Sequence, residues 1–146
     1  MMTLPDLSAA FCRWWHDRSP SDEWTLYPGM TREVAALAEW FEVCVDAAIP
    51  QPGNGVLEFV EVSVSVHVWS RPGPALGRGQ QFAEQARQRL AGALIPLANS
   101  SEDEYGVLRL REPELRDLTR ADRDAGRHGL QHWVVRCSGQ AQTTSV

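Results

Sequence analysis

The sequence predicts a single α+β domain, with an antiparallel or mixed sheet, a long β-hairpin and flanking helices. Five valines in strict alternation, from Val60 to Val68, predict the central strand over Val56–Arg71, and two segments with apolar residues at helical spacing predict the helices. The chain has 146 residues, 43% hydrophobic and 23% charged, as in one ordinary globular domain. We therefore expect residues 1–146 to fold as one unit, with 139–146 as a flexible polar tail.

A helix is predicted near the start of the chain, over Leu7–Arg18. Either Asp6 or Ser8 can cap its first turn, and Pro20 follows its end. Its apolar side chains recur every three or four residues and form one face: Leu7, Ala10, Phe11, Trp14 and Trp15. We expect this face to be buried against the sheet.

A hairpin is predicted in the middle of the chain. Trp24–Tyr27 is a short extended segment, and Thr31–Glu39 is either a short helix or a loop that leads into the hairpin. From Trp40 the apolar period becomes two, and Pro50–Gly55 is a turn. The residues expected on one face are Phe41, Val43, Val45, Ala47 and Ile49 of the first strand and Val60, Val62, Val64, Val66 and Val68 of the second.

The second half of the chain predicts one helix and two strands. The helix spans Gln80–Ile95 and ends at Pro96, and the strands are Val107–Arg111 and Gly129–Ser138. Between the strands, Glu112–His128 mixes arginine and aspartate, which is typical of a solvated loop. The helix should pack on one face of the sheet. The other face is then half exposed, or is covered by the N-terminal helix or by a neighbouring subunit.

Composition narrows the class of function. The formal net charge of −5 argues against broad, non-specific nucleic-acid binding, which needs a basic surface. All 14 basic residues are arginine and there are 6 tryptophans, two residue types that suit protein–protein interfaces. No apolar run approaches the roughly 20 residues of a membrane helix, and no basic segment followed by an apolar one opens the chain. The expected location is the cytosol, or a particle assembled there.

Two segments resemble metal sites. His128 and His132 have the i, i+4 spacing of metal-binding helices, but their segment contains glycine and leads into a strand, where the rings would be about 13 Å apart. Asp122 and Asp124 resemble the start of a calcium loop without its glycine and its closing glutamate. We expect ordinary histidines and a solvated loop, so no metal and no cofactor is predicted.

Two further features could carry chemistry. Gly73–Gly79 lies between a strand and a helix, but it matches neither phosphate-binding pattern and is expected to be a flexible connector. Cys44 and His67 could face each other across the hairpin as nucleophile and base, without an oxyanion hole or an orienting acid. Cys44 and the other two cysteines, Cys12 and Cys137, have no ligand spacing and are expected to be reduced thiols. We therefore predict that the chain is not an enzyme.

A contact surface is the kind of site that the sequence favours. His67 and Trp69 fall on the polar side of the predicted hairpin, where a tryptophan often meets another element or another chain. Arginines at the end of this strand and in the charged segment complete the candidate interface, which is His67, Trp69, Arg71, Arg116, Arg120, Arg123 and Arg127.

Three segments carry a resemblance to a known family. They are Ala38–Val45, the strand end His67-Val-Trp-Ser-Arg71, and His128-Gly-Leu-Gln-His-Trp-Val-Val-Arg136. An amphipathic helix, a short strand and an arginine- and aspartate-rich loop separate the last two. In this order, over Trp40–Cys137, they resemble the tail terminator (tail completion) proteins of long-tailed bacteriophages. The segment through Met30 departs from that pattern.

The resemblance implies an α+β sheet with flanking helices, a homohexameric ring, and neither enzymatic activity nor a cofactor. Such a ring caps the tail tube and joins it to the head–tail connector, at the tail–neck junction of a virion assembled in the host cytoplasm. Its partners are further copies of itself, tail tube protein and the connector or neck protein, with double-stranded DNA only as transient cargo and no membrane. The Pro50–Val60 tip and the Glu112–Arg127 loop are then expected to reach other subunits or the tube.

Two alternatives stay open. Another neck or minor tail component, such as a head-completion protein, is separated from a tail terminator by its stoichiometry. A small host ligand-binding or enzymatic α+β domain would instead have a concave pocket with convergent polar groups and perturbed titrating residues.

Overall fold

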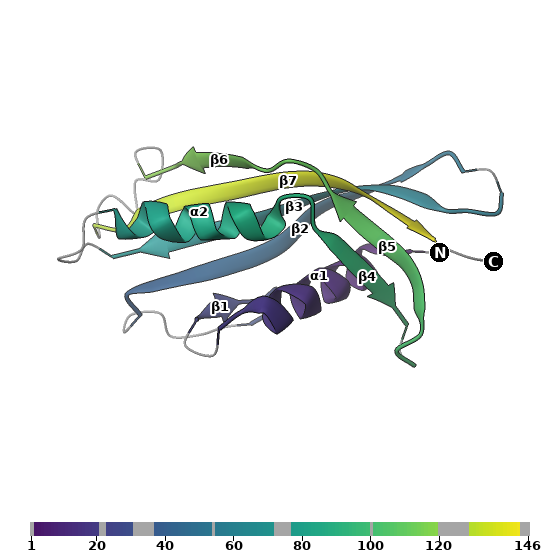
Figure 1. The fold of residues 1–146 in the computed structure, drawn as a ribbon, viewed down its shortest axis with the longest axis horizontal. Helices are drawn as coiled ribbons and strands as arrows, with labels where there is room; N and C mark the ends of the chain where they lie inside the picture. The colour runs from purple at the N-terminus through teal and green to yellow at the C-terminus, as the bar shows by residue number, and fades with distance from the viewer. Residues whose placement is uncertain are drawn as a thin grey trace.

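The predicted α+β class is confirmed by a computed structural model that describes residues 2–20, 23–30, 37–53, 55–71, 77–99, 101–119 and 129–143. In these residues the chain forms two helices and one curled sheet (Figure 1). The elements, in chain order, are α1 (Leu4–Arg18), β1 (Thr25–Leu26), β2 (Glu39–Gln51), β3 (Phe59–Ser70), α2 (Arg78–Leu90), β4 (Leu94–Ala98), β5 (Glu104–Leu110), β6 (Glu114–Asp117) and β7 (Gln131–Thr143).

The sheet is built around the predicted hairpin. β2 and β3 pair antiparallel from Glu39 opposite Ser70 to Gln51 opposite Phe59, so the long hairpin is confirmed. The strand order is β1-β2-β3-β7-β5-β4, with β1 parallel to β2 and the remaining pairs antiparallel. β6 pairs with β7 as well, beyond the stretch that β5 occupies. The last strand of the sequence therefore lies inside the sheet, between β3 and the run formed by β5 and β6.

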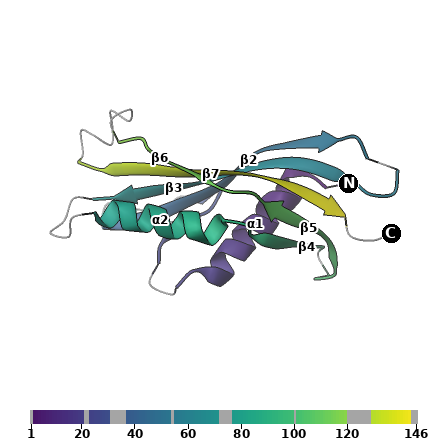
Figure 2. The ribbon, with the colours of Figure 1, turned by 45° about the horizontal axis from the view of Figure 1, so that its top comes forward.

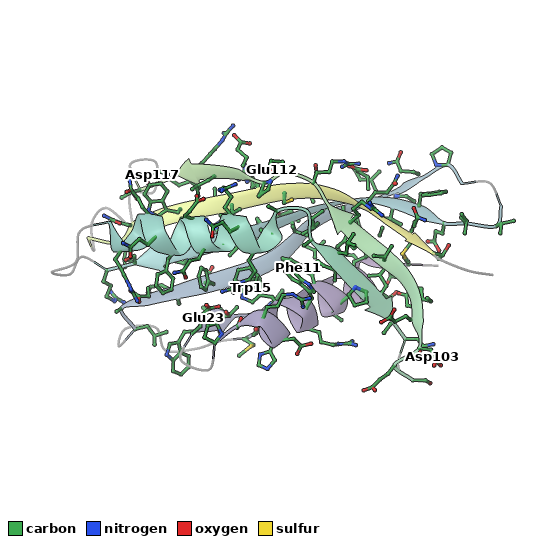
Figure 3. The ribbon with its side chains drawn as sticks, viewed as in Figure 1. Phe11, Trp15, Glu23, Asp103, Glu112 and Asp117 are labelled. Atoms are coloured by element: carbon green, nitrogen blue, oxygen red, sulfur yellow. The ribbon has the colours of Figure 1, made fainter. Side chains whose placement is uncertain are left out.

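Both helices cover the same face of the sheet, the face that carries the valines (Figures 1 and 2). In Figure 3, Phe11 and Trp15 lie between α1 and the sheet. The Trp15 ring meets Phe41 of β2 edge-on at 5.3 Å, and Phe41 stacks on Phe82 of α2 at 5.3 Å. The two helices thus share one core with the valines of β3, each at most 1% exposed: Val60, Val62, Val64, Val66 and Val68.

The N-terminal helix begins earlier than the sequence indicated. Its cap is Thr3, not Asp6 or Ser8, because Thr3 and Asp6 form a capping box. Asp6 N donates to Thr3 Oγ1 at 3.3 Å, and Thr3 N donates to Asp6 Oδ2 at 2.9 Å. The predicted buried face is confirmed, with all five of its residues buried: Leu7, Ala10, Phe11, Trp14 and Trp15.

A bulge in β2 changes which residues face the core. The register with β3 shifts between Val45 and Ala47, so Asp46 is an extra residue on β2. Beyond it, Ala48 packs against the core, whereas Ile49 is 58% exposed. The expectation that Ala47 and Ile49 share a buried face with Phe41 is therefore wrong, because one inserted residue reverses the facing of every residue after it.

The second helix ends sooner than expected. α2 stops at Leu90, Gly92 has a positive φ of 64°, and Leu94–Ala98 forms β4. Pro96 lies inside this strand instead of ending a helix. Because β4 is the edge of the sheet, the missing N–H of Pro96 can face outward without loss of a ladder hydrogen bond.

The polar C-terminal segments are more ordered than their composition suggests. Within the segment expected to be a loop, Glu114–Asp117 forms β6. Residues 139–143, expected to be a flexible tail, belong to β7 and pair with both β3 and β5. Ala141 is fully buried there, and a Cβ on Gly139 would lie 2.5 Å from the Arg109 carbonyl oxygen, so small residues allow the close approach. The expectation of a loop is therefore wrong at 114–117, and the expectation of a flexible tail is wrong at 139–143, while 120–128 and 144–146 lie outside the described residues.

Two other expectations can be placed. The extended segment expected at Trp24–Tyr27 contains β1, which is Thr25–Leu26, and the strand expected at Val107–Arg111 is confirmed from Val107 to Leu110, where β5 ends. The residues 31–36, left open between helix and loop, lie outside the described part of the chain. Among the described residues, no helix is long and apolar enough to cross a membrane.

Candidate functional site

A row of stacked rings crosses three strands on the face of the sheet opposite α1 and α2. Trp40 of β2, Trp69 of β3 and His132 of β7 are neighbours in the strand register. Ring centroids are 6.0 Å apart for Trp40 and Trp69, with planes 13° apart, and 3.8 Å apart for Trp69 and His132, with planes 5° apart. His67 adds a fourth ring, 5.1 Å from His132. We call these four residues the ring row.

The ring row is held together by polar contacts as well as by stacking. His67 Nδ1 and His132 Nε2 are 2.9 Å apart and share one hydrogen bond, with the donor set by the tautomers. At the other end, the Arg71 guanidinium lies 5.6 Å from the Trp40 ring centroid. Trp40 is 4% exposed and His132 is 7% exposed, whereas His67 and Trp69 are half-buried. The faces of these rings therefore contact other groups of the same chain, so a partner protein would contact the edges of the rings.

Of the five arginines of the predicted interface, the structure describes Arg71, which lies beside the ring row, and Arg116, which lies on β6. Arg71 is engaged by the chain itself, because its Nε donates to the Leu37 carbonyl oxygen at 2.8 Å and its backbone N–H donates to Ala38 O at 2.8 Å. Arg116 is exposed on β6, where its Nε donates to Glu114 at 2.7 Å. The other three predicted members, Arg120, Arg123 and Arg127, lie outside the described residues.

Cys44 does not face His67. Its neighbour across the hairpin is Ser65, with Sγ and Oγ 2.9 Å apart, and Asp46 Oδ1 accepts hydrogen bonds from both groups. Burial raises the pKa of the Cys44 thiol to about 11. The thiol is thus protonated at neutral pH, and it contacts Ser65 and Asp46 instead of His67, so the nucleophile–base pair considered from the sequence does not form.

Most residues of the candidate metal and phosphate features are not described by the structure. His128, Asp122, Asp124 and residues 72–76 lie outside the described residues. His132 is part of the ring row. Within the described ranges, no three histidine, cysteine, aspartate or glutamate side chains gather closely enough to hold an ion.

The tip of the β2–β3 hairpin is an exposed feature that the sequence interpretation placed in part in the core. Ile49 is 58% exposed and Val56 is 60% exposed. The hairpin extends beyond the rest of the sheet at one end of the molecule (Figures 1 and 2). One signal was visible in the sequence, because residues 47–57 contain no charged side chain, unlike a typical solvated turn.

A second exposed apolar feature lies beside the C-terminal end of α1. Trp24 is 39% exposed and Met30 is 47% exposed. Together with His16, Pro20 and Tyr27 they line a hollow of about 590 Å³. We call it the Trp24 hollow. In Figure 3, Glu23, which also lines the hollow, lies near the end of α1 away from the hairpin tip.

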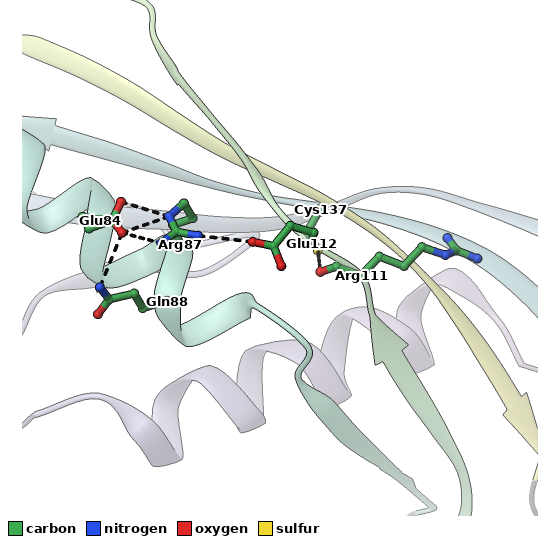
Figure 4. Close-up of polar contacts among 6 residues, drawn as sticks. All are labelled: Glu84, Arg87, Gln88, Arg111, Glu112 and Cys137. Atoms are coloured by element: carbon green, nitrogen blue, oxygen red, sulfur yellow. Dashed lines mark hydrogen bonds and ion pairs between the residues drawn. The ribbon is translucent and has the colours of Figure 1, made fainter.

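Where β5 passes into β6, the sheet is stabilised by ion pairs and close packing. Figure 4 shows Arg87 of α2 between Glu84 of the same helix and Glu112, where the chain passes from β5 to β6. The hydrogen bond from Arg87 lowers the pKa of Glu84. Cys137 Sγ donates to the Arg111 carbonyl oxygen at 3.0 Å, and burial raises the pKa of this thiol to about 11. These contacts anchor the β5–β6 run to α2 and β7.

No known protein-family model matches the chain, and no curated protein matches it.

Proposed function

We propose that the chain is a structural subunit of a bacteriophage tail, a tail terminator that forms a ring on the end of the tail tube and joins the tube to the head–tail connector. It acts by assembly and by contact with its neighbours, not by catalysis. Its partners are further copies of the chain, tail tube protein and the connector or neck protein, at the tail–neck junction of the virion.

The observation that carries this proposal is the projecting β2–β3 hairpin with an aliphatic tip. Ile49 and Val56 are more than half exposed at 58% and 60%, on an arm that leaves the core. Exposed aliphatic side chains on such an arm are typical of a subunit that buries them against a neighbour. In addition, α1 and α2 cover one face of a mainly antiparallel sheet, which agrees with the α+β fold that the resemblance implies.

The segments that carry the resemblance meet in space, which supports their use as one unit. His67–Ser70 of one segment lies on β3 and His132–Arg136 of another lies on β7, and these two strands pair side by side. The ring row also joins these two segments to Trp40, which lies near the start of the remaining segment, Ala38–Val45. The net charge of −5 also agrees with a ring through which DNA passes, because an acidic protein disfavours tight binding of that DNA.

The stoichiometry and location of the assembled protein test the proposal. We expect a six-fold ring by native mass measurement, bound to tail tube protein, and a position at the tail–neck junction in images of the virion. A twelve-fold ring, or a monomer bound to the portal, would instead indicate another neck component. Absence of the chain from the virion would exclude both readings.

A further inference from the structure

The two exposed apolar features lie at opposite ends of one molecule. Phe41 N donates to the Trp24 carbonyl oxygen at 2.9 Å, which places the Trp24 hollow beside the first residues of β2. Ile49 follows Phe41 by eight residues on the same strand, or roughly 26 Å of extended chain. The views of Figures 1 and 2 agree, with β1 and the end of α1 far from the hairpin tip. The tip therefore cannot fill the hollow of its own chain.

The tip has the chemistry of an inserted element. Its exposed residues are aliphatic, proline, glycine or amide: Ile49, Pro50, Gln51, Pro52, Gly53, Gly55 and Val56. The residues 47–57 carry no charge that would have to be desolvated on burial. Two prolines also restrict the loop, which lowers the entropy lost when it is fixed.

The Trp24 hollow matches the tip in size and charge. A volume of about 590 Å³ is enough for a few aliphatic side chains, and Trp24, Tyr27 and Met30 offer apolar walls. Among the described residues that line it, Glu23 has the one carboxylate, and this is already ion-paired, because Arg89 Nη1 and Nη2 donate to it at 2.8 and 3.0 Å. An uncharged tip would therefore enter without leaving a buried charge unpaired.

We propose that the hairpin tip of one copy seats in the Trp24 hollow of the next copy. Because the two surfaces differ and lie at opposite ends, the contact is heterologous and passes head to tail from copy to copy. Such contacts give a closed ring when the rotation between copies closes. This inference rests on the proposed function for its ring, and it assigns the surfaces through which the copies meet.

Single-surface variants test the contact. The tip variant is Ile49→Asp with Val56→Asp, and the hollow variants are Trp24→Asp and, separately, Met30→Asp. Each introduces a charge at an exposed position, so the far-ultraviolet circular dichroism spectrum should match that of the unchanged chain. We expect self-association, measured by sedimentation, to weaken about tenfold or more in each variant. Leu94→Asp, on the β4 edge and 53% exposed, is the matched control and should assemble normally.

Mixing the variants gives the sharper result. The tip variant retains a working hollow, and the hollow variant retains a working tip. An equimolar mixture should therefore form dimers and stop there, because only one intact contact remains. Assembly of a hollow variant on its own would mean that tips meet tips, and would overturn the inference. A mixture that stays monomeric, or an unchanged chain that is monomeric at every concentration, would overturn it too.

The same variants separate this inference from the proposed function. If the tip variant still forms rings but no longer binds tail tube protein, the tip contacts the tube, and the copy-to-copy assignment is wrong. If all the variants form six-fold rings on the tube, the assignment is again wrong while the proposed function stands. If the unchanged chain assembles head to tail through these surfaces but is absent from virions, the assignment stands and the proposed function falls.

Discussion

Trp69 and His132 stack with ring centroids 3.8 Å apart and planes 5° apart, and they join the central hairpin to the last strand of the chain. The strand register opposes Trp69 to His132 and, on the other side, to Trp40. Trp69 is thus the middle of the ring row, and its loss should separate the outer members.

We expect Trp69→Ala to lower the free energy of unfolding by about 3 kcal/mol, because a half-buried indole and two stacking contacts are removed. A double-mutant cycle with His132→Ala should give a coupling of about 0.5–1.5 kcal/mol in urea unfolding. Trp69→Phe is the control, since it retains an aromatic ring and should lose less. Zero coupling would mean that the stack contributes no stability.

The valine face of β3 offers a second test. Val64 is 1% exposed, and Val64→Asp would bury an unpaired carboxylate at a cost of several kcal/mol. We expect the variant to be lost from the soluble fraction. Ser63 is the preceding residue and faces the opposite side of the sheet. The Ser63→Asp variant should therefore remain soluble with an unchanged circular dichroism spectrum. A soluble, cooperatively folded Val64→Asp chain would contradict the burial of this face.

Gly139 tests the close approach of β7 to β5. A Cβ there would lie 2.5 Å from the Arg109 carbonyl oxygen, a backbone atom that cannot move alone. We expect Gly139→Ala to destabilise the fold by about 1–3 kcal/mol, measured by thermal or urea unfolding. Ser138→Ala, at an exposed neighbouring position, is the comparison and should change stability little. Equal stabilities would mean that the strands can separate without cost.

The capping box predicts a dependence on pH. The hydrogen bonds from the Thr3 side chain and backbone lower the pKa of Asp6 below its ordinary value of 3.8. Because the folded pKa is the lower one, the stabilisation is present above pH 3.8 and is lost as the pH falls through the folded value. Thr3→Ala should cost about 1 kcal/mol at neutral pH, and less in acid. A difference that is constant with pH would exclude the ionised carboxylate as the cause.

The thiols offer a chemical test. The raised pKa values of Cys12, Cys44 and Cys137 should make alkylation by iodoacetamide at neutral pH much slower in the folded chain than in urea. Mass measurement of the peptides reports each site separately. Fast, selective modification of folded Cys44 would instead indicate an activated thiol.

The regular part of the fold could be predicted because side-chain periodicity is a property of the sequence. Alternation in β3 and the apolar face of α1 both correspond to buried residues. Asp46 and Pro96 could not be placed in this way. A bulge is fixed by pairing with β3, and a proline is tolerated in β4 only because that strand is an edge.

The candidate site could be predicted only in part for a related reason. His67 and Trp69 were identified from the polar side of one strand, but Trp40 and His132 join them through the register of two other strands. The tip was expected to contact other subunits, but Ile49 was assigned to the buried face because it continues the alternation of Phe41 and Val43. Its uncharged loop was the available signal. The Trp24 hollow depends on how α1 and β1 meet, which local pattern does not encode.

The position of β7 has a consequence for synthesis. Among the described strands this one is the last in sequence, yet it pairs with β3, β5 and β6 and closes the sheet from within. Until it has been synthesised, one edge of β3 and the inner edges of β5 and β6 lack the strand with which they pair. The sheet therefore cannot be completed before β7 leaves the ribosome, and a nascent chain halted before Gln131 should depend on a chaperone to stay soluble.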